Sequence, residues 1–245
     1  DVEGSDAADK IAILSGLAFG GSINRSNIPT TGINHLEAVD VNYARKLGYG
    51  IKLLAISEKD KSPSKTEGSQ PLSIWVEPTL VPEDNPLAGV NGVNNAILVE
   101  GNPIGQVMFF GPGAGSGPTA SAVVADILNI AGIQSMSEDN IFNLDPLLSA
   151  KSWRNCHIAE KKQITKKNYI RLIAKDSPGV IGEIGTIFGK KKISIESIVQ
   201  FDVTDEEAEI VVITHKIQQG QLEEALLEIK NLSQVKRIAA TMGCL

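Results

Sequence analysis

The fold of this chain is organised around residues 1–10, DVEGSDAADK, which lead directly into an apolar run. Gly4 and Ser5 end any earlier helix, Ser5 or Asp6 can cap the next one, and apolar residues then recur at helical spacing. We therefore predict a helix that begins near Asp6. Residues four apart share a helix face, so the Asp6 carboxylate and the Lys10 ammonium are expected to lie side by side.

An ammonium fixed beside a carboxylate suits proton transfer to an oxygen atom. The same ten residues also fit an acidic first turn that faces the helix dipole, with an ordinary Asp/Lys pair on a solvated face. Taken alone, this stretch leaves both interpretations open.

The composition is that of a globular protein that binds small molecules or other proteins. The chain has 245 residues, of which 42% are hydrophobic and 21% are charged, and its formal net charge is −6. A nucleic-acid surface usually carries a clustered excess of Lys and Arg, so nucleic acid is not an expected partner.

Cysteine and histidine are too scattered to suggest a metal or redox site. Cys156 and Cys244 lie far apart in the sequence, and the three histidines do not cluster, so we predict reduced thiols and no metal. The apolar runs are too short to span a bilayer, and the acidic start lacks a signal peptide and an initiator Met. We expect a cytoplasmic protein with no membrane partner, whose first residue is a cut end.

Periodicity predicts an α+β fold in the first half: a mixed or antiparallel sheet with helices on one face. The predicted elements are a helix over 37–47, a strand over 51–57, an exposed turn over 59–70, a strand over 72–79, a hairpin of 96–100 with 104–110, and a helix over 119–131. Alternation in the second strand places Trp75 outward, where it could serve an interface.

A glycine-rich run, Gly111-Pro112-Gly113-Ala114-Gly115-Ser116-Gly117, lies between a predicted strand and a predicted helix. Backbone amides at such a place can approach an anionic or polar ligand. The run is not a dinucleotide fingerprint, because Ser116 and Pro118 occupy the last positions of the two possible Gly-x-Gly-x-x-Gly frames. A plain turn at the entrance of a helix explains it equally well.

Several of these motifs together resemble the homoserine dehydrogenases. They are Asp1-x-x-Gly4-x-Asp6-x-x-x-Lys10, Gly32-Ile33, the segment 37–48, Val76-Glu77-Pro78-Thr79, Pro86-Leu87-Ala88, Asn94-Asn95-Ala96, the run 111–115, and Thr119 to Asp126. The resemblance implies a substrate-binding and dimerisation domain over residues 1–133, in which 111–133 returns to pack on a nucleotide-binding domain. It implies a homodimer or homotetramer.

This resemblance also implies the reaction and its residues. Lys10 would be the catalytic acid, Asp1 and Asp6 would bind the substrate, and Gly113 and Gly115 would contact NADP or NAD. The implied reaction interconverts L-aspartate 4-semialdehyde and L-homoserine in threonine, methionine and isoleucine biosynthesis. Because the family begins with a Rossmann domain that this sequence lacks, we expect the chain alone neither to bind NAD(P)H tightly nor to turn over.

A second unit follows a basic linker over residues 134–167. From residue 168 to 245 the periodicities predict the order β-α-β-β-α-β, which is the ferredoxin-like plan. With Asp176-x-Pro178-Gly179-Val180 at its first turn and Ile193-Ser-Ile-Glu-Ser-Ile198 in its second strand, this unit resembles the ACT regulatory domain.

The ACT resemblance implies an amino-acid effector, threonine first among the candidates. The implied effector-binding residues are Asp176, Pro178, Gly179, Val180, Ser194 and Ile195. Physically, Gly179 lets the backbone come close, helix amides favour a carboxylate, and Asp176 could hold an ammonium. In the alternative, Asp176 caps the helix and Pro178 starts it. The chain could then act only as an effector-binding module or as a dimerisation scaffold without catalysis.

Overall fold

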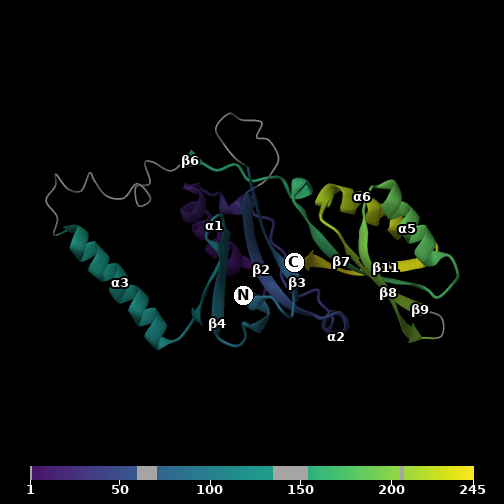
Figure 1. The fold of residues 1–245 in the computed structure, drawn as a ribbon, viewed down its shortest axis with the longest axis horizontal. Coiled ribbons are helices and arrows are strands. Elements are labelled where there is room, and N and C mark those ends of the chain that lie inside the picture. Colours follow the sequence, from purple (N-terminus) through teal and green to yellow (C-terminus); the bar gives the residue numbers. More distant parts are fainter. Residues whose placement is uncertain (1, 60–70, 135–153, 205–206) are drawn as a thin grey trace. The chain divides into compact units, whose positions relative to one another are not determined.

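The computed structural model describes residues 2–59, 71–134, 154–204 and 207–245 (Figure 1). All but the first residue of the predicted turn over 59–70 and most of the predicted linker over 134–167 lie outside them. The chain forms two compact units, residues 1–82 with 154–245 (the first unit) and residues 83–153 (the second unit).

The described part of the first unit contains fifteen elements. They are α1 (Ser5–Phe19), β1 (Gly21–Ser22), η1 (Arg25–Asn27), α2 (Ala38–Lys46), β2 (Tyr49–Lys59), β3 (Leu72–Pro82), β6 (Arg154–Asn155), η4 (Lys161–Gln163), β7 (Thr165–Lys175), α5 (Val180–Lys190), β8 (Ile195–Thr204), β9 (Glu207–Thr214), β10 (Ile217–Gln218), α6 (Gln219–Lys230) and β11 (Val235–Cys244).

One continuous sheet runs through this unit in the order β2-β3-β11-β7-β9-β8, and β10 pairs with β7. Its pairs are antiparallel except for β3 with β11, which run parallel where Thr79 lies opposite Gly243 and Leu80 opposite Cys244. The predicted mixed α+β architecture is confirmed. The sheet joins the two regions that the sequence separates by a linker.

Helices α1 and α2 cover one face of β2 and β3, as predicted for this half. Ala8 of α1 is fully buried in a cluster with Leu72, Ile74 and Val76 of β3. These three residues alternate along the strand and therefore point to the same face.

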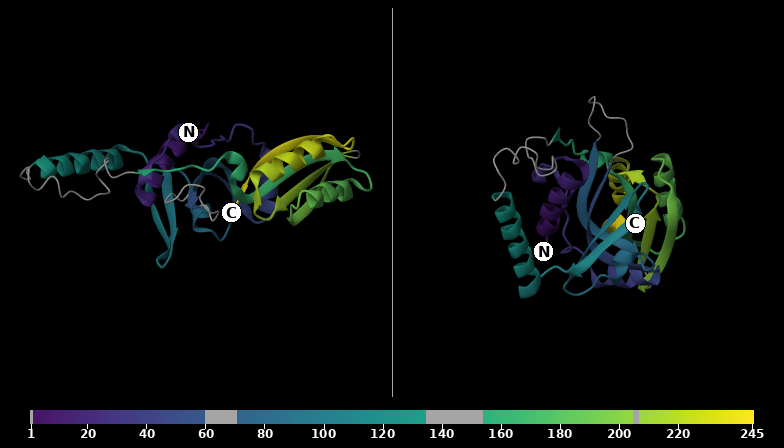
Figure 2. Two further views of the ribbon diagram at one scale, coloured as in Figure 1. Left: turned by 90° about the horizontal axis from the view of Figure 1, so that it is seen from above. Right: turned by 60° about the vertical axis from the view of Figure 1, so that its left-hand side comes forward.

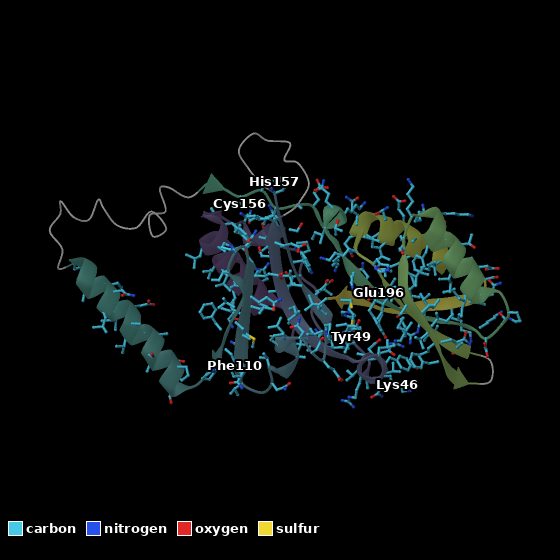
Figure 3. The ribbon with its side chains drawn as sticks, in the orientation of Figure 1. Lys46, Tyr49, Phe110, Cys156, His157 and Glu196 are labelled. Atoms are coloured by element: carbon cyan, nitrogen blue, oxygen red, sulfur yellow. The ribbon has the colours of Figure 1, made fainter. Side chains whose placement is uncertain are left out.

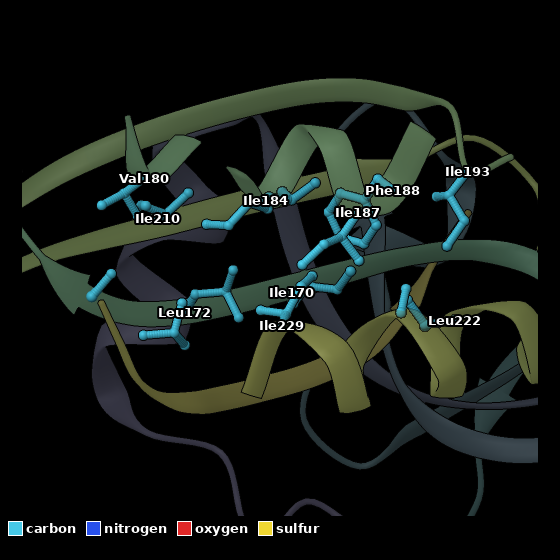
Figure 4. Packing of buried hydrophobic residues seen from close by; sticks show 14 of the residues in the cluster. Ile170, Leu172, Val180, Ile184, Ile187, Phe188, Ile193, Ile210, Leu222 and Ile229 are labelled. Carbon is cyan, nitrogen blue, oxygen red and sulfur yellow. The ribbon is translucent and has the colours of Figure 1, made fainter. Parts of the chain in front are cut away.

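The predicted β-α-β-β-α-β order is confirmed by β7, α5, β8, β9, α6 and β11. Helices α5 and α6 lie together over one face of these strands (Figures 1 and 2). Figure 4 shows Ile184 and Phe188 of α5 facing Ile170 of β7 and Ile229 of α6. All four side chains are fully buried, so this cluster is a well-formed core.

The opposite face of the same strands is covered by α2. Tyr43 and Ala44 of this helix pack with Val211, Ala240 and Met242 in a second core. The Tyr43 ring also stacks on Phe201 with a centroid separation of 4.0 Å. The ACT-like strands therefore lie between helices on both faces.

Strand β3 differs from its prediction because it is buried on both faces. The outward position predicted for Trp75 is wrong, since its side chain is only 6% exposed. The cause is tertiary: β3 lies between β2 and β11, and Trp75 borders a pocket that Leu222 and Leu226 of α6 also line.

The second unit contains η2 (Pro86–Gly89), β4 (Asn94–Gly101), β5 (Gly105–Pro112) and α3 (Ser116–Gln134). The predicted hairpin is confirmed, with Gly101 opposite Gly105 beside the turn. Apolar side chains are exposed on the hairpin and on α3: Ile97, Val99, Phe109, Phe110, Val123, Val124, Ile127, Leu128 and Ile130.

Candidate functional site

The start of α1 is held in place by backbone contacts rather than by a side-chain cap. The N-cap residue is Gly4, in the left-handed conformation with φ 81°, and no side chain caps the helix. The predicted cap by Ser5 or Asp6 is therefore wrong. A Cβ atom on Gly4 would lie 3.1 Å from Thr30 Cγ2 and 3.2 Å from Val76 Cγ1, so the buried backbone needs glycine there.

A second glycine, Gly32, packs closely against the backbone that precedes α1. A Cβ atom on Gly32 would lie 2.4 Å from the Val2 carbonyl oxygen and 2.6 Å from Glu3 Cα. The Ile33 N–H donates to that same Val2 carbonyl at 2.9 Å. The backbone just before α1 is thus fixed against residues 30–33.

Lys10 and Asp6 form the pair that helical spacing predicts. Lys10 Nζ lies 2.8 Å from Asp6 Oδ2, and the two side chains are 55% and 52% exposed. Pairs this exposed add little stability, so the fold does not require it. It leaves a cation and an anion available to a ligand, on a helix whose start is rigidly seated. Asp1 lies outside the described residues.

The glycines of the run in the second unit differ in the space beside them, and a Cβ atom on Gly111 or Gly117 would meet nothing within 4 Å. A Cβ atom on Gly113 would lie 1.9 Å from Asn95 Nδ2, so the space beside this residue is already filled by Asn95. Gly115 has φ 124°, and a Cβ atom there would contact only Pro118 Cδ, at 3.6 Å. Free space therefore does not single out Gly115 among the glycines at the entrance of α3, and its contact with a cofactor stays a prediction.

The turn between β7 and α5 lines a pocket of about 470 Å³, which we call the turn pocket. Its walls include Asp176, Pro178, Gly179, Val180 and Gln200, and Asp176 Oδ1 accepts a hydrogen bond from Gln200 Nε2 at 2.9 Å. The turn pocket thus brings together four of the six predicted effector residues.

Two details of this region bear on the other predictions. The N-cap of α5 is Gly179 with φ 94° and no side-chain cap, so the alternative in which Asp176 caps the helix is wrong. Ser194 and Ile195 are not among the turn-pocket residues; the Ser194 carbonyl accepts from the His215 N–H at 3.0 Å.

Local sequence patterns carry no signal for the buried ionic network that lies beneath α2. The fully buried Arg171 of β7 donates to Asp40 through Nε at 2.7 Å and through Nη2 at 3.0 Å. It also donates to Glu209 at 3.3 Å and pairs with Glu37 at 3.1 Å. Burial alone would lower the pKa of Arg171, but the hydrogen bonds and charges of Asp40, Glu37 and Glu209 together outweigh it, and the pKa is raised.

Neither a metal cluster nor a membrane span is found among the described residues. Figure 3 shows Cys156 and His157 well apart from Glu196 of β8, and no group of three or more His, Cys, Asp or Glu side chains there could hold a metal ion. Within the same residues, every helix is too short or too polar to cross a bilayer.

Comparison with known proteins gives two family matches. A family model described as homoserine dehydrogenase matches residues 1–128, and one described as ACT domain matches residues 168–234. The homoserine dehydrogenase match includes Lys10 and Asp6, and the ACT match includes the residues of the turn pocket.

Individual relatives agree with these matches. Homoserine dehydrogenases from Synechocystis sp. and Neisseria gonorrhoeae are 48% and 38% identical over 100% and 97% of this chain. A crystal structure of a homoserine dehydrogenase from Thiobacillus denitrificans has a TM-score of 0.86 and 33% identity, and it is matched by the whole chain over 54% of its own length. The chain covers 55% and 53% of the two relatives, about half of each.

Proposed function

Because the chain belongs to the homoserine dehydrogenase family, we propose that it supplies the substrate-binding and regulatory part of an enzyme that interconverts L-aspartate 4-semialdehyde and L-homoserine. The observation that carries this proposal is the Lys10–Asp6 pair on the rigidly seated helix α1. The chain spans about half the length of its relatives, so the reaction is proposed for the complete protein.

The chemistry suits an ammonium at this place. NADH or NADPH, when bound, supplies the hydride that adds to the aldehyde carbon. The carbonyl oxygen then gains negative charge, which Lys10 neutralises by giving up one proton from Nζ, and homoserine is formed. In the reverse direction Lys10 takes the hydroxyl proton back.

The carboxylates bind and orient in this scheme. Asp6 holds the Lys10 ammonium at hydrogen-bond distance, and Asp6 and Asp1 bind polar groups of the substrate. The contacts of Gly4 and Gly32 support precise placement, because backbone fixed on both sides cannot drift relative to the helix. Gly113 and Gly115 would contact the cofactor.

Regulation is proposed at the turn pocket. Asp176 offers a carboxylate for an ammonium group, and Gly179 exposes backbone at the start of α5, so an α-amino acid fits, with threonine as the first candidate. Ser194 and Ile195 stay predictions. We also propose a cytoplasmic homodimer or homotetramer that serves threonine, methionine and isoleucine biosynthesis.

The test is hydride transfer by the complete protein, followed through NADPH absorbance with aspartate semialdehyde. Lys10→Ala should abolish turnover, and Lys190→Ala, a change on the exposed end of α5, should not. The 245-residue chain by itself should be inactive. Turnover in the Lys10 variant would exclude its role as the acid.

A second function, effector binding without catalysis, is favoured by the turn pocket alone. Calorimetry of the chain with L-threonine should detect binding, and Asp176→Ala should remove the part of it that belongs to the turn pocket. If the complete protein binds threonine but never oxidises NADPH, the binding module is the correct description.

A further inference from the structure

A second pocket, of about 320 Å³, opens in the first unit where β3 meets α6 and the start of β7. We call it the junction pocket. Trp75 and Glu77 of β3, Lys166 of β7, and Gln219 and Leu222 of α6 are among its walls. Its size is in the range of small-molecule sites.

Two opposite charges meet in this pocket. Lys166 Nζ donates to Glu77 Oε1, and the two side chains are only 11% and 15% exposed. Burial lowers the pKa of Lys166, and the nearby Glu77 charge acts against that shift. The Lys166 ammonium also lies 6.0 Å from the Trp75 ring centroid. Both charges are therefore partly stripped of water and depend on each other.

Glycine makes room for the acidic partner. A Cβ atom on Gly243 of β11 would lie 2.5 Å from Glu77 Oε1, so any side chain there would push the carboxylate away. The parallel contact of β3 with β11 brings Gly243 to this place.

Two of the residues that line the pocket also carry a buried side-chain nitrogen that has no hydrogen-bond partner among the described residues. Trp75 Nε1 and Gln219 Nε2 are both buried and make no hydrogen bond. Both nitrogens are donors, so the group that would satisfy them is an acceptor. A buried donor without a partner costs free energy that a bound acceptor would recover.

We propose that the junction pocket binds the zwitterionic head group of a free α-amino acid. Its carboxylate is held by Lys166 and by the amide of Gln219, its ammonium by Glu77, and its side chain lies against Trp75 and Leu222. The ligand replaces one ion pair by two, so no buried charge is left alone. A plain carboxylate would leave Glu77 unpaired, and a plain amine would leave Lys166 unpaired.

The junction pocket lies on the same strand, β3, that packs against helix α1, which carries the Lys10–Asp6 pair. Val76 follows Trp75 in β3, and its side chain packs beside Gly4 at the start of α1. A ligand that shifts Glu77 therefore acts on the strand that supports α1. The binding step itself does not rest on the proposed function and can fail or succeed independently of it.

Trp75 provides the measurement. The chain has two tryptophans, and Trp153→Phe leaves Trp75 as the only one. Titration of this variant with L-threonine and L-isoleucine should change Trp75 fluorescence in a saturable way, and sodium acetate or ethylamine at the same concentration should not. An equal response to acetate, or no response to either amino acid, would overturn the proposal.

Variants in the same background locate the site. Glu77→Gln with Lys166→Met removes both charges together, and Gln219→Leu keeps the pair but removes the amide; each should weaken binding by at least about tenfold. Lys190→Met, the matched control, should leave it unchanged. Binding that survives both junction variants, or that Lys190→Met weakens to the same extent, would refute the proposal. Circular dichroism identifies a variant that does not fold. If one of the two junction variants does not fold, the binding measured with the other tests the proposal.

Discussion

Asp40→Ala is expected to destabilise the first unit by about 3–5 kcal/mol, the cost typical of removing one partner from a buried ion pair. Asp40 is fully buried in α2, and Arg171, its partner on β7, is fully buried as well. The substitution leaves a guanidinium without its main counter-charge, in a place where water cannot replace it.

The contacts of Asp40 support the upper part of this range. Its two oxygens accept four hydrogen bonds: two from Arg171, one from the Tyr169 hydroxyl at 3.2 Å, and one from the Glu37 N–H at 3.1 Å. Each bond to a charged group contributes about 1.5–3 kcal/mol, although Glu37 and Glu209 still pair with Arg171 in the variant and reduce the loss.

Urea unfolding followed by far-UV circular dichroism measures the effect. The midpoint should fall at an unchanged slope, since the buried surface is nearly the same. Asp9→Ala is the matched control, because Asp9 pairs with Arg25 at 2.7 Å on the surface and its side chain is 65% exposed. This control should cost about 0–1 kcal/mol.

A double variant separates the ion pair from general packing loss. Asp40→Ala with Arg171→Leu should cost less than the sum of the two single variants, because neither charge of the pair is then left unpaired. Additive losses, or an Asp40→Ala variant as stable as Asp9→Ala, would refute the reasoning that this network joins α2 to the sheet.

Three further predictions concern the α1 site and the end of the chain. In the complete enzyme, Lys10→Ala should lower kcat by at least about a hundredfold at unchanged thermal stability; an unchanged kcat would contradict this. Gly32→Ala forces a Cβ atom to 2.4 Å from the Val2 carbonyl oxygen and should raise the KM for homoserine. The control is Gly50→Ala, whose Cβ atom would meet no atom within 4 Å. Equal effects on KM would contradict the idea that close packing of Gly32 positions the start of α1. Burial raises the pKa of the Cys244 thiol from 9.0 to about 11, so its stabilisation is complete below pH 9 and is lost as the pH rises to about 11. Between pH 9 and about 11, the urea midpoint of Cys244→Ala should fall less steeply with pH than that of the unchanged protein. The same pH dependence in both proteins would contradict the raised pKa of Cys244.

Local spacing made the α1 pair and the β-α-β-β-α-β order predictable from the sequence. The Asp6–Lys10 contact needs only helical periodicity, and the order of strands and helices needs only alternation and glycine-rich turns. The family-model matches confirm both resemblances, which rest on short motifs that can be read directly from the sequence.

Contacts between distant segments could not be predicted in this way. Arg171 alternates with apolar neighbours in β7, as an outward residue would, and nothing local indicates that Asp40, 131 positions earlier, covers it. The burial of Trp75 is likewise not predictable from alternation, because β3 lies between β2 and β11 and residues of α6 line the pocket beside it. The Gly4 N-cap could not be predicted either, because the side chains that crowd this position belong to Thr30 and Val76, which are distant in the sequence.

Strand β7 connects the three regions that could carry regulation. It begins near Lys166 in the junction pocket, contains Arg171 in the buried network, and ends at Lys175, beside the turn pocket. Because Arg171 pairs with Asp40 of α2 and Lys166 pairs with Glu77 of β3, we expect a shift of β7 to be felt by the elements that pack against α1. Coupling free energy is reciprocal, so substrate bound at α1 must change amino-acid affinity by the same factor by which the amino acid changes substrate affinity. Titration of the complete enzyme with threonine, with and without homoserine, measures that factor, and equal affinities would mean that the shared strand transmits nothing.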